Sequence, residues 1–275
     1  ERLYHVHGED GFDLTAPPRQ APYPYEPIPN ADSIETIVQQ LRAQGLHPSP
    51  LPLGLIKPGE AGGCVLCNTC NSFPCRLQAK SDADVLCVRA AVGKPNVTLW
   101  TGAFARRLLS VRSGKRVEAD EIERGGQVLT VGATIIIVSC GAVNSAALLL
   151  RSANDAHPNG LANSSGLVGR RYMAHLATMI EAVDLGRRNE TTFQKTIAIN
   201  DYYLRGPKGG YPLGQIQAQG RTHGLMAKLH APWWGAWIPL PIYDWWVGRG
   251  YDWLAMSEDL PRVANRVMLD GAGRI

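Results

Sequence analysis

Four cysteines close together are the strongest chemical signal in this sequence. Cys64, Cys67, Cys70 and Cys75 follow the pattern C-x2-C-x2-C-x4-C. Chain reach forces thiols at this spacing into one neighbourhood. The spacing leaves three interpretations open: an iron–sulfur or zinc site, disulfide bonds, or free packed thiols. The run is close to that of bacterial ferredoxins, but its last cysteine comes one residue later and follows a proline instead of preceding one.

A second candidate site lies at Cys140-Gly141, after a run of β-branched residues. Ile135 to Val138 predicts a strand buried on both faces, as in a parallel sheet. After the glycine, apolar side chains recur at i, i+3, i+4 and i+7, which predicts an amphipathic helix: Val143, Ala146, Ala147 and Leu150. A strand, a glycine turn and a helix N-terminus would present backbone N–H groups to an anion.

The uncharged run from residue 130 to residue 150 is also long enough for a membrane span. Its periodicity changes at Gly141, however, and a uniform span does not explain that change. We therefore expect a buried strand and helix here and no transmembrane segment.

Composition places the chain among globular proteins. Of its 275 residues, 45% are hydrophobic and 19% are charged, so one large domain or two ordinary ones can form a core. The net charge of +4 comes without a basic stripe, which gives no argument for nucleic acid binding. The chain begins with Glu1 and stops in what resembles a turn followed by a strand. We therefore expect a fragment whose compartment the sequence does not indicate.

The remaining pattern predicts a mixed α/β fold. A helix should start at Asp32 and end at Gly45, after a proline-rich extended segment. A meander of short strands with glycine turns should follow a second helix, and longer antiparallel strands should come after it. The expected strands are 97–101, 104–111, 116–123 and 127–131, then 176–185, 195–204, 213–219, 253–256 and 266–269. Six of the seven tryptophans crowd between Trp233 and Trp253, where packing, a substrate or partner surface, and membrane-interface anchoring are the alternatives.

Several stretches together resemble one enzyme family. NVTLWTGAFARRL, TIIIVSCGAVNSAALLLRSA and GLANSSGLVGRRYMAH are similar to segments of the glucose–methanol–choline (GMC) oxidoreductases, FAD-dependent enzymes that oxidise alcohols and sugars. The most specific part is Gly141 to Ser152, which resembles the family's second signature. Ala146, Ala153 and Arg171 depart from the usual family residues at their positions.

The resemblance implies an FAD cofactor and an alcohol or sugar substrate that gives up hydride to the flavin. It implies that the backbone at Ala105 pairs with the adenine edge of FAD. It also implies that Cys140, Gly141 and Ala142 lie against the ribose and pyrophosphate. An electron-acceptor subunit or a quinone could take the electrons onward. Some dehydrogenases of the family carry an iron–sulfur cysteine motif where this chain has its cysteine cluster.

On this resemblance we expect three segments. Residues 1–56 form an extended segment and a helix. Residues 57–170 form part of a Rossmann-like FAD-binding domain with the cysteine cluster and the meander, and residues 171–275 form part of an antiparallel-sheet substrate domain.

The family's GxGxxG motif does not occur in the sequence where a buried strand leads into a helix, and the catalytic histidine is expected beyond Ile275. We therefore assign no catalytic residue. The chain alone should bind FAD weakly or not at all and catalyse nothing. The alternative function is an electron-transfer or zinc-binding module built on the cysteine cluster.

Overall fold

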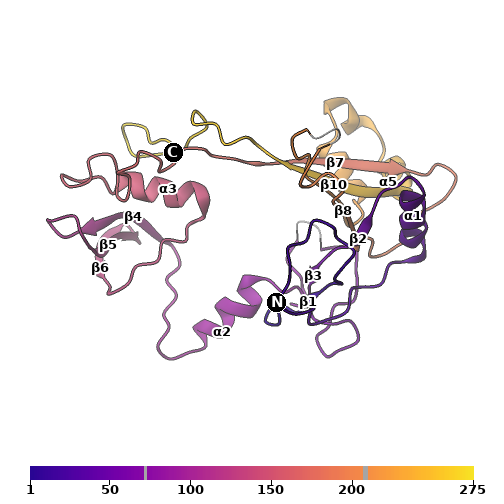
Figure 1. Cartoon of the computed structure of the whole chain (residues 1–275), viewed down its shortest axis with the longest axis horizontal. Helices are drawn as coiled ribbons and strands as arrows, with labels where there is room; N and C mark the ends of the chain where they lie inside the picture. Colours follow the sequence, from indigo (N-terminus) through magenta and orange to yellow (C-terminus); the bar gives the residue numbers. More distant parts are fainter. Residues whose placement is uncertain (71–72, 207–209) are drawn as a thin grey trace. The chain divides into compact units, whose positions relative to one another are not determined.

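The structure is a computed structural model that describes residues 1–70, 73–206 and 210–275. The chain folds into two compact units (Figure 1). The first unit combines Glu1–Val97 with His175–Glu258, and the second unit combines Thr98–Ala174 with Asp259–Ile275. The three segments predicted from the sequence were defined by their expected function. Their limits at residues 56 and 170 do not coincide with the limits of these units.

A five-stranded antiparallel sheet forms the centre of the first unit, in the order β2-β8-β9-β10-β7. Its strands are β2 (Pro48–Pro50), β7 (His175–Val183), β8 (Ile197–Ile199), β9 (Gln215–Ala218) and β10 (Gly250–Glu258). The antiparallel sheet predicted for the C-terminal half is therefore present. Its second strand is much shorter than the predicted 195–204, and β2 comes from the N-terminal segment.

Helix α1 (Asp32–Ala43) covers this sheet with the predicted apolar face. Ile34 and Val38 are buried against Ile197 and Ala218. Two backbone hydrogen bonds end the helix in a Schellman motif: the N–H of residue 45 donates to the carbonyl of residue 42, and the N–H of residue 46 donates to that of residue 41. Gly45 takes a φ of +80°, a conformation that favours glycine, so the sequence predicted both the helix and its end.

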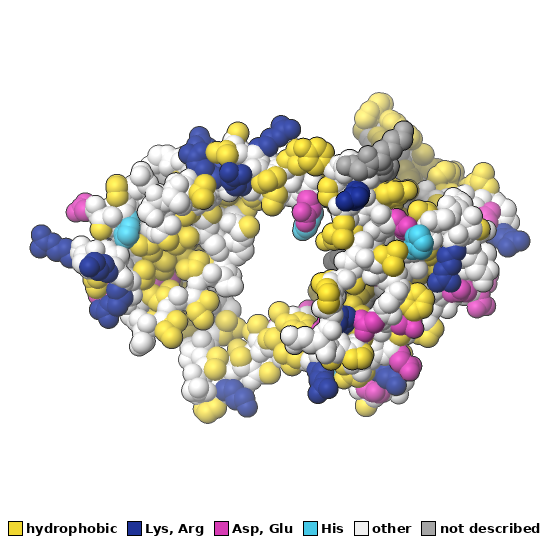
Figure 2. Space-filling model, viewed as in Figure 1, with side chains coloured by type: hydrophobic (Ala, Val, Ile, Leu, Met, Phe, Trp, Pro, Cys, Tyr) yellow, Lys and Arg dark blue, Asp and Glu magenta, His cyan; other side chains and the backbone are white. Residues whose placement is uncertain are grey.

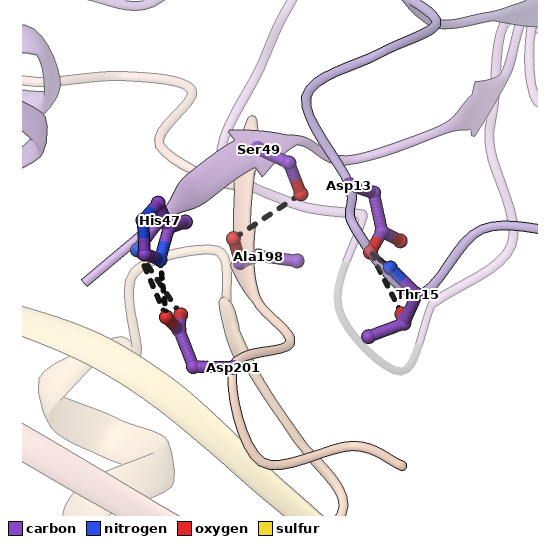
Figure 3. Close-up of polar contacts among 6 residues, drawn as sticks. All are labelled: Asp13, Thr15, His47, Ser49, Ala198 and Asp201. Carbon is purple, nitrogen blue, oxygen red and sulfur yellow. Dashed lines mark hydrogen bonds and ion pairs between the residues drawn. The ribbon is translucent and has the colours of Figure 1, made fainter.

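Polar contacts fasten the N-terminal segment to the sheet (Figure 3). His47 Nδ1 lies 2.7 Å from a carboxylate oxygen of Asp201, just before β2. The Ser49 hydroxyl within β2 donates to the Ala198 carbonyl in β8 at 3.5 Å. The first contact lies beside the β2–β8 pairing and the second lies within it. The pairing adds to the sheet a strand that is far away in sequence.

The other elements of the first unit are short. Among the described residues they are β1 (Val6–His7) paired with β3 (Leu53–Gly54), the π-helix η1 (Asp84–Val88), α2 (Arg89–Val92), α4 (Gly224–His230), the 3-10 helix η3 (Trp233–Trp237) and α5 (Leu240–Val247). Trp253 packs against the core of the sheet, but Trp233 and Trp237 are 83% and 84% exposed. Packing therefore accounts for only part of the tryptophan cluster.

The second unit is built from a meander and one helix. The antiparallel strands β4 (Ala103–Ser110), β5 (Val117–Arg124) and β6 (Gln127–Gly132) confirm the predicted meander, and α3 (Gly141–Arg151) confirms the predicted helix. Leu108, Leu148 and Leu161 form the core between them. The strand predicted at 97–101 is absent from these described residues. The one predicted at 266–269 is reduced to an isolated bridge at Arg266.

The prediction of a buried parallel strand at Ile135 to Val138 is wrong for this structure. The segment belongs to no strand, and Ile135 and Ile137 are 77% and 84% exposed. A strand forms only where a neighbour satisfies its backbone hydrogen bonds, and every ladder between strands of the described residues is antiparallel. Local hydrophobicity was therefore not enough to form a strand here. Figure 2 shows that hydrophobic side chains gather on the surface of the molecule.

Across residues 1–70, 73–206 and 210–275, no helix combines the length and the apolar character needed to cross a lipid bilayer.

Candidate functional site

The turn into α3 adopts a conformation that calls for glycine. Gly141 has a φ of +77°, in the left-handed region. Apart from its chain neighbours and the backbone of its own helix, a Cβ placed on Gly141 would meet no atom within 4 Å, so the turn is open. Just before it, the Cys140 N–H donates to the Ser145 hydroxyl at 3.0 Å, which fixes the chain as it enters the helix. The first turn of α3 is thus rigidly placed and open to approach.

Buried contacts behind the turn hold α3 on β4. Leu148 of α3 packs on Leu108 of β4. Ser152 is 1% exposed, and its hydroxyl accepts the Leu108 N–H at 2.8 Å and donates to the Leu148 carbonyl at 2.6 Å. This one hydroxyl satisfies two buried backbone groups, so it couples the helix to the strand.

Ala105 lies on β4 and belongs to the same core. It pairs with Ile122 of β5, and the β4–β5 register shifts directly after it. It packs against the leucine core together with Val138, which precedes the turn. The segments predicted to line FAD therefore meet one core. The open start of α3 fits an anionic group, because the N–H groups of a first helical turn and the helix dipole favour negative charge. The individual roles of Ala105, Cys140, Gly141 and Ala142 toward FAD stay predictions.

The cysteine cluster surrounds a cavity of about 1040 Å³ in the first unit. All four predicted cysteines line it: Cys64, Cys67, Cys70 and Cys75. Spacing thus predicted their convergence. All six cysteines of the chain are free thiols, and no group of three His, Cys, Asp or Glu side chains in the described part of the chain could hold a metal ion. Among these residues the cluster does not fit an iron–sulfur or zinc site, and no step is derived through one.

A lysine that the sequence did not single out also lines the thiol cavity. Lys195 lies between the buried residues Gln194 and Thr196, and burial lowers the pKa of its amine. The nearby Cys70 thiol acts in the opposite direction, by favouring the charged amine. Nothing in its local sequence distinguishes this lysine, because its position depends on the folded cavity.

A second cavity in the first unit, of about 730 Å³, is lined by two carboxylates that sequence reasoning also missed. Glu181 on β7 stands directly opposite Asp252 on β10. Burial raises the pKa of both groups, and their proximity raises that of Glu181 further, although a hydrogen bond from Trp246 acts against this shift. An Asp within the apolar strand sequence YDWLAM was a signal that could have drawn attention to this pair.

Comparison with known proteins places these features in a family. A family model described as GMC oxidoreductase matches residues 50–177, a range that holds the thiol cluster, the meander and the α3 turn. The 6'''-hydroxyparomomycin C oxidase of Streptomyces lividus is 32% identical over 215 residues, which cover 74% of this chain and 39% of that protein. The 2-methyl-1,2-propanediol dehydrogenase of Mycolicibacterium austroafricanum is 29% identical over 173 residues, which cover 59% of this chain and 31% of the relative. The chain thus spans about two fifths of the first relative and about a third of the second.

A solved structure shares the fold. Pyridoxine 4-oxidase from Mesorbium loti aligns with a TM-score of 0.52 and 18% identity, over 88% of this chain and 47% of that one. The likeness agrees with the mixed α/β architecture and its antiparallel sheets. The chain belongs to the GMC oxidoreductase family.

Proposed function

We propose that this chain forms part of the FAD site and part of the substrate-binding sheet of a flavoprotein that oxidises the CH–OH group of an alcohol or a sugar. The observation that carries the proposal is the Gly141 turn, a left-handed glycine that opens the first turn of α3 within the segment matched by the family model. The named relatives are an oxidase and a diol dehydrogenase, which supports this reaction class.

In this proposal the second unit forms one wall of a Rossmann-like FAD site. The backbone from Cys140 to Ala142 would lie against the ribose and pyrophosphate, and the backbone at Ala105 would lie against the adenine. FAD, when bound, supplies the acceptor for the hydride of the alcohol carbon. The contribution of these residues is to bind and orient the cofactor, and no proton transfer is assigned to them.

The first unit would contribute the antiparallel sheet that borders the substrate. The alternative function, an electron-transfer or zinc-binding module, requires a ligand set that the described residues do not form. The flavoprotein proposal needs no such set, so the structure gives it the better support.

The test compares two glycines with the same backbone conformation. Gly126, in the turn between β5 and β6, also has a φ of +77° and an open Cβ position. Gly141→Ala and Gly126→Ala therefore impose similar backbone strain, but only the first adds a methyl group to the proposed FAD wall. Equilibrium dialysis of the 275-residue chain against FAD, up to millimolar concentration, measures the effect.

We expect weak FAD binding by the unaltered chain and by Gly126→Ala. Gly141→Ala should bind at least about ten-fold more weakly, or ~1.4 kcal/mol. Equal losses in both variants would contradict the proposed FAD wall.

A further inference from the structure

The thiol cavity has no role in the proposed flavin chemistry. Its four cysteines are all half-buried free thiols, so they are neither sealed in a core nor fully exposed. Its lining is mostly apolar and includes Phe193, and Lys195 lies near the thiols. Such a set of accessible, clustered thiols suits redox chemistry better than packing.

Within the cluster, Cys67 and Cys70 form a close pair. The Cys70 thiol donates to the backbone carbonyl of Cys67, with sulfur and oxygen 3.6 Å apart. The side chains are close enough for hydrogen bonding between them to affect the pKa of each. The short loop between them therefore folds the Cys70 sulfur back to within 3.6 Å of the Cys67 backbone.

The surroundings of the two sulfurs differ. The Thr69 hydroxyl lies 3.2 Å from the Cys67 sulfur, and this hydrogen bond lowers the pKa of the Cys67 thiol. Burial raises the pKa of Cys70 and that of Cys64, whose sulfur accepts the Leu66 N–H at 3.4 Å. Cys67 is thus the thiol best suited to attack an oxidant, and Cys70 is the neighbour placed to form a disulfide with it.

The backbone beside the pair is held in an unusual conformation. Leu66, which precedes Cys67, has a φ of +50°, which a residue with a Cβ rarely adopts. Its side chain packs against the core formed by Ile28, Leu55 and Phe193, which holds the loop in place. The thiol pair therefore lies on a loop that the packing of Leu66 holds against this core.

We propose that Cys67 and Cys70 form a redox-responsive thiol pair that closes to a disulfide in the presence of a hydroperoxide. The Cys67 sulfur attacks the peroxide, the O–O bond breaks, and hydrogen peroxide leaves a sulfenic acid on Cys67 and one water. The Cys70 sulfur then attacks the sulfenic sulfur, the S–S bond forms, and a second water leaves. Two thiols lose two electrons and two protons, and one peroxide is reduced to two waters. This proposal does not depend on the alcohol or on FAD.

The test uses the reduced 275-residue chain treated with one equivalent of hydrogen peroxide and then alkylated with N-ethylmaleimide. Cleavage after Leu66 and after Arg76 releases a peptide that carries Cys67, Cys70 and Cys75. We expect this peptide to carry a single alkylation, at Cys75. Its mass should be about 2 Da below that of the singly alkylated peptide with two free thiols, because a disulfide removes two hydrogen atoms. Exposed Cys140 is the internal comparison, and the pair should react at least about ten-fold faster than it does.

Variants identify the two steps. Cys70→Ser should stop at the sulfenic acid, which dimedone traps on Cys67, whereas Cys67→Ser should give neither product. Cys75→Ser is the matched control from the same cavity and should still form the disulfide. Circular dichroism checks the fold of each variant, and the dimedone result stands even if Cys67→Ser does not fold.

Three results would overturn the proposal. The first is oxidation of Cys140 as fast as that of the pair, which would mean that exposure alone decides reactivity. The second is a disulfide that joins Cys67 or Cys70 to Cys64 or Cys75. The third is iron or zinc in the purified chain that protects the pair from alkylation.

Discussion

The candidate site of the second unit is made of backbone groups, whereas those of the first unit are made of side chains. In the second unit the candidate site is backbone, the open turn at Gly141, and the polar group buried behind it is the uncharged Ser152. In the first unit the candidate sites are side chains, and the polar groups around their cavities include the ionisable residues Lys195 and Asp252. Under the proposed function, the second unit is the scaffold for the cofactor, whereas the first unit holds groups that react or titrate.

The backbone site should depend strongly on the packing behind it. Leu148→Ala removes a side chain that is 3% exposed in the core under α3 and should lower the free energy of unfolding by about 2–5 kcal/mol. Leu167→Ala is the control in the same unit, because Leu167 is 53% exposed, and it should change stability by less than about 0.5 kcal/mol. Chemical denaturation measures both. Equal effects would mean that the turn does not rest on this core.

A smaller effect should follow from the buried hydroxyl alone. Ser152→Ala leaves the Leu108 N–H without its hydrogen-bond acceptor and should cost about 1–3 kcal/mol. Ser113→Ala, in an exposed turn of the same unit, should stay within about 0.5 kcal/mol of the unaltered chain. If Ser152→Ala proved as mild as Ser113→Ala, the link between α3 and β4 would be weaker than its geometry indicates.

In the first unit, replacing the buried carboxylate Asp252 should raise stability instead of lowering it. Burial raises the pKa of Asp252 above its usual 3.8, so folding favours its protonated form. The stability that this gives is present below the usual pKa and is lost as the pH rises through the raised value.

Asp252→Asn has no carboxyl group to ionise, so it does not lose stability as the pH rises, and it removes a like charge opposite Glu181. It should therefore stabilise the unit by roughly 0.2–1 kcal/mol at neutral pH and by less in acid. Thermal melts across pH, with Asp155→Asn as the exposed control, measure the difference. A destabilised Asp252→Asn at neutral pH would show that this carboxylate is needed in its charged form.

Sequence reasoning succeeded where the determinants are local. The periodicity of α1 and α3 and the glycine turns of the meander predicted those elements, because each depends on neighbours in the chain. Spacing alone likewise predicted that the cysteines share one neighbourhood.

It failed where the determinants are distant. Ile135 to Val138 has the composition of a buried strand, but no neighbouring strand of the described chain pairs with it. Lys195 and the Glu181–Asp252 pair acquire their surroundings only when β7 and β10 pair and the cavities form. The chemical state of the thiols was also left open, because spacing does not distinguish a metal, a disulfide and free thiols.

The central claim, that the Gly141 turn forms a wall of an FAD site, is tested most directly by amide hydrogen exchange with and without FAD. The first amides of α3 have no carbonyl acceptor within the helix, so they should exchange rapidly in the free chain. Saturating FAD should slow exchange at residues 141–143 by at least about ten-fold and leave the turn at Gly125-Gly126 unchanged. FAD binding that leaves residues 141–143 unprotected would contradict the account.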